Sequence, residues 1–195
     1  GGLSGVAEGR IGTADDERSL VGGLTAGIGP FAFHAEGVHR SSDDYRVPKA
    51  FGASRVAGSY NDTSTVSVGG SWIGPDGYLG VAYTRQRSEY GLPGHSHDYE
   101  DCHPHGTHLH CGGHGHDDDH DHDHGDDHDH DHEGVPFVKL RSERFDIRSD
   151  YRDPLPGFEK VRFRMSFTDY AHDEIEGDEV ATTFRNKARD IRFEL

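Results

Sequence analysis

Apolar residues outside positions 95–133 recur at every second position over long stretches, and this alternation constrains the fold most strongly. The clearest stretch is 161–168, where Val161, Phe163 and Met165 alternate with Arg162 and Arg164. Successive side chains of a β-strand point to opposite faces of a sheet, so this period gives one apolar and one polar face. No stretch has a convincing helical period, and the chain is therefore expected to be all-β.

Glycine and proline turns divide the alternating stretches into about eight strands, which we expect to form an antiparallel up-and-down meander. The expected strands cover residues 3–12, 19–28, 31–39, 63–73, 78–89, 137–151, 161–168 and 181–195. Val138 and Leu140 are out of phase with Phe145 and Ile147. We therefore expect near 141–143 either a β-bulge or a strand that continues beyond its apolar surroundings.

The connections alternate between tight turns at 29–30, 74–77 and 153–157 and longer polar loops at 40–62, 89–134 and 172–179. This asymmetry is typical of outer-membrane β-barrels. Charged residues on the polar face suit a water-filled lumen, and Trp72 and Tyr78 fit an interfacial aromatic belt. A soluble β-sandwich would show the same alternation, although strands this long are unusual for one. A closed eight-stranded barrel would have to bury many charges in its narrow interior.

Residues 95–133 contain 14 of the 17 histidines, both cysteines, 13 acidic residues and no lysine or arginine. The segment has almost nothing apolar to bury, so we expect a solvated loop. Imidazole nitrogens bind zinc, copper or nickel, and carboxylates add oxygen ligands. The segment therefore predicts metal capture. The alternatives are a tract without function or a purification tag, but the run is central, mixed in composition and interrupted by cysteines.

Cys102 and Cys111 could bind metal as thiolates or form a disulfide, and the second is favoured if the scaffold lies outside the cytoplasm. The formal charge is −16, of which the 95–133 segment contributes −13. No basic patch with interleaved aromatic residues is present, which argues against nucleic-acid binding. An enzyme would need a few ligands in fixed positions. A His-Asp repeat does not provide them, so we expect no enzymatic activity. The sequence contains no run of 18 apolar residues, so no transmembrane helix is expected.

Six stretches resemble the TonB-dependent outer-membrane zinc receptors of the ZnuD type. They are GLSG at Gly2, GGLTAGIG at Gly22, HAEGVHRSSDDYRVP at His34, GYLGVAYTRQRSEYGLPGHSHDYEDCH at Gly77, PLPGFEKVR at Pro154 and FTDYAHDEIEGD at Phe167. The resemblance spans essentially all of the chain, and YGLPGHSHDYEDCH is its most specific part.

The resemblance implies a 22-stranded barrel with an N-terminal plug that takes up zinc with energy from TonB. Residues 1–195 would be the first part of that barrel, without its plug or remaining strands, and residues 90–134 would be its extracellular zinc-gathering loop. The resemblance also implies a disulfide between Cys102 and Cys111. It places an inner-site carboxylate near 172–179, for which Glu174 and Glu179 are the candidates. The implied partners are zinc ions, outer-membrane lipid and, through the plug, the TonB system.

We therefore expect zinc capture at the bacterial cell surface, with nickel and copper also able to bind. A better-ordered part of the loop would be followed by a multivalent His-Asp antenna. The expected ligands are His95, His97, His103, His105, His108, His110, His114, His116, His120, His122, His124, His128, His130, His132, Asp98 and Asp101. The alternative is a small outer-membrane or periplasmic β protein that buffers metal without transport. His34 and His39 are expected to be polar groups of the lumen or rim. His172, beside Asp173 and Glu174, could be either a metal ligand or such a polar group.

Overall fold

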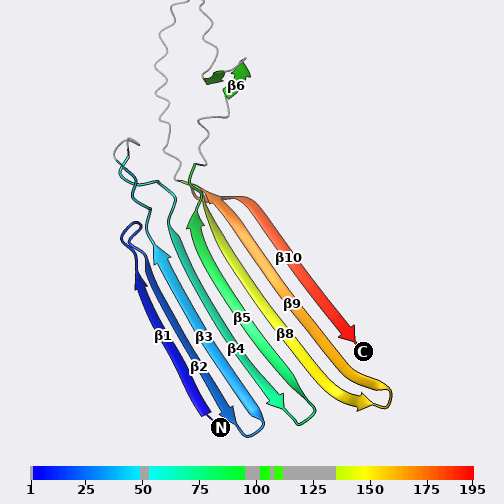
Figure 1. Ribbon diagram of the computed structural model, residues 1–195. Coiled ribbons are helices and arrows are strands. Elements are labelled where there is room, and N and C mark those ends of the chain that lie inside the picture. The colour runs from blue at the N-terminus through cyan, green and yellow to red at the C-terminus, as the bar shows by residue number, and fades with distance from the viewer. Residues whose placement is uncertain (1, 49–52, 95–101, 106–107, 112–134) are drawn as a thin grey trace, which may run out of the picture.

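A computed structural model of the chain describes residues 2–48, 53–94, 102–105, 108–111 and 135–195 (Figure 1). Eight strands form one antiparallel sheet in the order β1-β2-β3-β4-β5-β8-β9-β10. They are β1 (Gly2–Ile11), β2 (Arg18–Ile28), β3 (Phe31–Ser42), β4 (Asn61–Ile73), β5 (Gly77–Gly91), β8 (Phe137–Leu155), β9 (Phe158–Glu176) and β10 (Glu179–Glu194). A separate hairpin joins β6 (Cys102–His105) to β7 (His108–Cys111).

The predicted up-and-down meander of eight long strands is confirmed, because each strand of the large sheet pairs with the next one along the chain. The strands are 10 to 19 residues long. β1 and β10 lie at opposite edges, so the sheet is open, and the described residues place no second layer on either face (Figure 1). This arrangement is neither a β-sandwich nor a closed eight-stranded barrel.

Two expected connections are shorter than predicted. The polar loop expected at 172–179 is wrong, because β9 continues to Glu176 and β10 begins at Glu179. Gly177, with a φ of 57°, makes the tight turn there, so acidic residues alone were a poor sign of a loop. The turn expected at 153–157 is also narrower, since β8 runs to Leu155 with a register shift after Arg152.

The phase change in β8 has the second of its two predicted causes. Residues 137–151 pair without interruption with both β5 and β9, so no bulge lies near 141–143. Val138 and Leu140 therefore share the polar face with Arg144, and Arg141 and Glu143 share the opposite face with Phe145. The strand continues beyond its apolar surroundings, and charged residues follow the apolar ones on the same face.

We call that opposite face the banded face, because an apolar band is followed on it by charged rows. A row here means residues that pair directly across the strands. One row of the band contains Leu24, Ala35, Val68, Tyr83, Phe145 and Phe167. The next row toward the longer loops contains Arg85, Glu143, Asp169 and Lys187 on the later strands. On β5, β8 and β9 the apolar band therefore gives way to charged residues within one row.

The edge of the apolar band crosses the strands obliquely. On β2 the first charged residue above the band is Arg18, whereas on β5 it is Arg85 and on β10 it is Arg189. Following the direct pairs across the sheet, Arg189 lies in the row of Leu24, three rows below Arg18. The band is thus inclined to the rows of paired residues.

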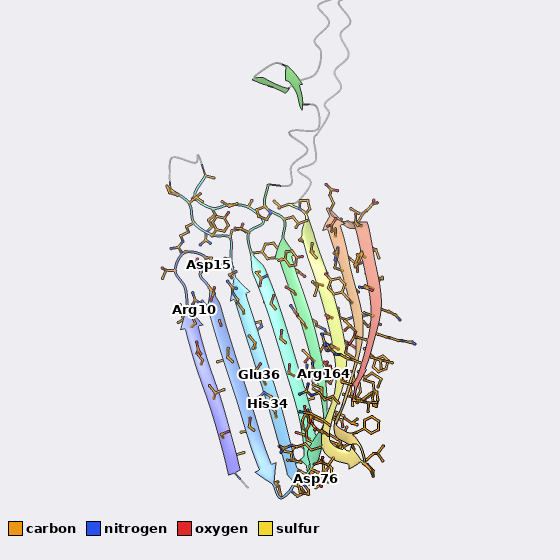
Figure 2. All side chains as sticks on the ribbon, turned by 45° about the vertical axis from the view of Figure 1, so that its right-hand side comes forward. Arg10, Asp15, His34, Glu36, Asp76 and Arg164 are labelled. Atoms are coloured by element: carbon orange, nitrogen blue, oxygen red, sulfur yellow. The ribbon has the colours of Figure 1, made fainter. Side chains whose placement is uncertain are left out.

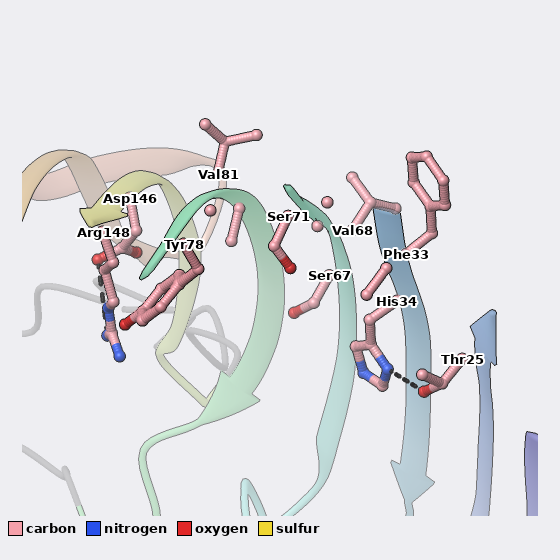
Figure 3. Close-up of a pocket in the computed structure, with 15 residues that line it drawn as sticks. Thr25, Phe33, His34, Ser67, Val68, Ser71, Tyr78, Val81, Asp146 and Arg148 are labelled. Carbon is pink, nitrogen blue, oxygen red and sulfur yellow. Dashed lines mark hydrogen bonds and ion pairs between the residues drawn. The ribbon is translucent and has the colours of Figure 1, made fainter. Parts of the chain in front are cut away.

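The polar face carries small, hydroxylic and charged residues. In Figure 3, His34, Ser67, Tyr78 and Arg148 project from one side of the sheet, while Phe33, Val68 and Val81 project from the other. A hollow of about 420 Å³ lies over the small residues Ala32, Gly69, Ser71, Gly80 and Ala82. Tyr78 belongs to the polar face, opposite to Trp72, so the two rings cannot lie together in one aromatic belt. Trp72 is on the banded face, 6.4 Å from the ring of Tyr151.

The sheet has almost no core of its own. Among the described residues of the strands, the buried hydrophobic side chains are Val138 and Ala171, which are 2% and 8% exposed. The large side chains of the apolar band are open instead, including Phe33, Val68, Trp72, Val81 and Phe193. The described part of the chain contains no helix that could cross a membrane.

Candidate functional site

The longer connections meet at one end of the sheet, which we call the loop end. Residues 12–17, 43–60, 92–136 and 177–178 connect strands there, and turns at 29–30, 74–76 and 156–157 form the other end. Figure 2 shows Asp15 at the loop end and Asp76 at the opposite end. The connection over 92–136 contains the histidine-rich residues 95–133, and we call it the His-rich segment. It therefore leaves the sheet at the same end as the other long connection, which covers 43–60. The predicted asymmetry holds for these loops, but not for 172–179.

The base of the His-rich segment is fixed by backbone hydrogen bonds on both sides. The Gly91 amide donates to the Tyr60 carbonyl at 3.3 Å, and the Leu92 amide donates to the Pro136 carbonyl at 2.9 Å. Pro136 and Val138 are buried just beyond the segment. The two ends of the segment are thus held together by groups whose hydrogen bonds are satisfied, which fixes its point of origin.

Two glycines let neighbouring loops meet at this base. Gly58 has a φ of 76°, a conformation that favours glycine, and a Cβ there would lie 2.3 Å from Val135. A Cβ on Gly91 would lie 2.3 Å from the carbonyl oxygen of Gly58. Gly58 therefore packs against the backbone of Gly91 on one side and against the side chain of Val135 on the other.

Replacing Gly91 by alanine is expected to separate these two loops and to destabilise the loop end by about 1–3 kcal/mol, the usual cost of overpacking. Hydrogen exchange at the Leu92 amide would measure the change, and exchange should become faster. Gly80→Ala is the matched control in the same strand, because its Cβ would meet Ser71 at an ordinary 3.5 Å. Equal exchange in both variants would contradict the proposed packing.

A cluster around Asp16 holds the loop over 43–60 against the β1–β2 turn. Asp16 accepts hydrogen bonds from Arg46 at 2.9 Å and from Arg55. The Arg46 amide also donates to the Ala14 carbonyl at 2.7 Å. The hydrogen bond from Arg55 is the main reason that the pKa of the Asp16 carboxyl lies below its usual value. This cluster was not predictable from the sequence, because Asp16 and its arginine partners are distant along the chain.

Within the His-rich segment the described backbone is the β6–β7 hairpin. Its register places Cys102 opposite Cys111 and His103 opposite His110. Directly paired residues of an antiparallel hairpin have Cα atoms about 4.5–5.5 Å apart, a separation that a disulfide can bridge. The side chains of the hairpin, including His105 and His108, lie outside the description. So do the remaining predicted ligands, which are His95, His97, Asp98, Asp101, His114, His116, His120, His122, His124, His128, His130 and His132.

The two candidate inner-site carboxylates lie at the loop end of the sheet, on adjacent strands. Glu174 is in β9, opposite Val138 and Thr182, and Glu179 begins β10 opposite Glu176. His172 is also inside β9, where its Nδ1 lies 3.1 Å from the Tyr170 hydroxyl and its ring stacks on Phe184. Among the described residues, no three His, Cys, Asp or Glu side chains gather as a metal site would require.

The other two scaffold histidines have hydrogen-bond partners in the sheet. His34 Nδ1 lies 2.8 Å from the Thr25 hydroxyl, and its Nε2 lies 3.9 Å from the Glu36 carboxylate. His39 Nδ1 lies 2.9 Å from the Ser64 hydroxyl on the banded face, above the apolar band. His34 faces the polar side of the sheet and His39 the banded side, so the two do not share one face.

Charged residues in the phase of the apolar band were expected only near 141–143, and the charged rows of the banded face extend beyond that stretch to the neighbouring strands. Arg85, Arg87 and Glu89 have the same phase as Tyr83, and this phase was the available signal. A comparison of the chain with known protein families finds no family that matches it.

Proposed function

We propose that this chain is a wall segment of an outer-membrane β-barrel that takes up zinc, and that its His-rich segment captures the metal at the cell surface. The observation that carries the proposal is an apolar band left uncovered on a long antiparallel sheet with almost no core. Contiguous apolar surface of this kind is rare on a soluble protein, whereas a barrel wall turns such a band toward lipid.

The inclination of the apolar band supports this assignment. The band edge descends by three rows over the six strand spacings from β2 to β10. Successive rows of one face lie two residues apart along a strand, at about 3.3 Å per residue, and neighbouring strands lie about 4.8 Å apart. From these spacings, the strands tilt by roughly 35° from the normal to the band edge. Strands of outer-membrane barrels tilt by about 35–45°. A soluble sheet covered by a second layer gives no reason for the match.

The position of the His-rich segment supports the second half of the proposal. In outer-membrane barrels the long loops face outward and the short turns face the periplasm. The His-rich segment lies at the loop end, and its base packs against the other long loop through Gly58 and Gly91. The two halves of the proposal are therefore consistent, since a wall whose apolar band faces lipid and whose long loops face outward would hold this segment at the cell surface.

The metal half is tested by zinc titration of the full chain at pH 7.5 and pH 5.5. An imidazole must be deprotonated to bind zinc, and its ordinary pKa is about 6.5, so affinity is expected to fall as the pH drops through about 6. Isothermal calorimetry would measure both affinities. Equal affinities at the two pH values would contradict histidine ligation and would favour a carboxylate site.

A further inference from the structure

A group of basic side chains lies on the banded face just beyond the apolar band and is not used by metal capture. Arg87 on β5 and Arg141 on β8 are direct cross-strand partners. Both are exposed, and among the described residues neither has an ion pair. Ser64, Lys139 and Arg185 lie beside them in a shallow hollow of about 610 Å³.

The neighbouring charges are already neutralised within the sheet. Arg185 pairs with Asp173 at 2.8 Å, and Lys139 pairs with Glu89 at 3.9 Å. In the row below, Arg85 pairs with Glu143 at 3.4 Å. Of the charges that line the hollow, this leaves the two arginines and the carboxylate of Asp62 without an ion pair in the described structure. The unpaired charge of the hollow is therefore positive.

Like charges directly opposite each other destabilise a sheet, and an anion that binds both would remove that cost. A guanidinium group matches phosphate oxygens with two parallel hydrogen bonds. We propose that Arg87 and Arg141 together bind the phosphate of a lipid headgroup in the surrounding leaflet. This inference rests on the proposed function, because it requires the banded face to meet lipid.

The position along the strand fits such a ligand. Arg87 lies one row, or about 6.7 Å along the strand, beyond the first charged row at Arg85. The headgroup layer of a bilayer is about 5–8 Å thick on each side of its hydrocarbon core. Arginine side chains extend toward that layer along their apolar stems. Phosphates attached to lipid would therefore be presented at this depth and in this orientation.

The test uses the full chain in vesicles of equal parts phosphatidylcholine and phosphatidic acid, the second of which carries a phosphomonoester. Native mass spectrometry of the released protein would count the retained lipids. The wild type is expected to retain phosphatidic acid with at least about tenfold preference, as for charge-assisted hydrogen bonds. The double variant R87Q/R141Q should lose this preference. R164Q, on the polar face and likewise without an ion pair in the described structure, should keep it.

Two further measurements distinguish failure of the headgroup site from failure of the proposed function. Quenching of Trp72, the single tryptophan, by phosphatidylcholine with brominated acyl chains reports whether the apolar band meets lipid at all. Strong quenching without a phosphatidic-acid preference would overturn the headgroup site and leave the proposed function standing. Absent quenching would overturn both. Displacement of the lipid by millimolar inorganic phosphate would overturn the assignment to a lipid headgroup, because a free anion would then suffice.

Discussion

Replacing Val81 by arginine is expected to lower the free energy of unfolding of the membrane-inserted chain by about 2–4 kcal/mol, the cost of an arginine near the bilayer midplane. Val81 is the middle one of three apolar residues of β5 on the banded face, between Leu79 and Tyr83. It is 43% exposed, so the larger side chain meets no packed core that it could disrupt. The expected loss therefore comes from the lipid environment. Urea titration in phosphatidylcholine vesicles, followed by Trp72 fluorescence, measures it.

Ala82→Arg is the matched control for this substitution. Ala82 is the next residue of the same strand, it faces the polar side, and it lies directly opposite Asp146. An arginine there gains a carboxylate neighbour and remains in water, so its effect on stability is expected to stay within about 0.5 kcal/mol. Equal losses from Val81→Arg and Ala82→Arg would mean that both faces meet the same medium. That result would contradict a membrane wall.

The strands were predictable because their signal is local. Alternation in a stretch such as 161–168 specifies both the strand and its two faces, and the observed partners of Phe163 and Met165 agree with it. The acidic stretch from 172 to 179 misled the prediction, because polarity resembles a loop when a strand extends beyond its apolar band. There His172 and Glu174 continue the ladder with β8. A strand that ends in water carries no apolar period to mark its last residues.

The candidate site was predictable only in its composition. Fourteen histidines in one segment indicate metal binding without any knowledge of the fold. The contact between Gly58 and Gly91 and the cluster of Asp16 with Arg55 join residues far apart in sequence, and they depend on the order of the strands. The pair of Arg87 and Arg141 depends on the register between β5 and β8. Each of these features needed the pairing of the sheet before it could be inferred.

Deleting residues 114–132 is expected to remove more than half of the bound zinc, because eight of the fourteen histidines of the segment are lost. The tightest site should persist with its dissociation constant changed by less than about threefold, since closely spaced weak sites add capacity and local retention. That site is expected to use His95, His97, His103 and His105, which precede or belong to the β6–β7 hairpin. Calorimetric titration at pH 7.5 gives both the number of sites and their affinities.

Replacing those four histidines by asparagine should have the opposite effect, with most of the capacity kept and the tightest dissociation constant raised at least about tenfold, because a defined zinc site needs several fixed ligands.

The double variant C102S/C111S separates the two roles of the cysteines. The hairpin register sets Cys102 opposite Cys111, so a disulfide would act by holding the ligands together, and His95 and His97 would still bind without it. Thiolate ligation instead predicts a larger loss of affinity in C102S/C111S than in the four-histidine variant. If the deletion of 114–132 abolished the tightest site as well, zinc would be held by the repeats themselves, and the division into a tethered site and an antenna would be wrong.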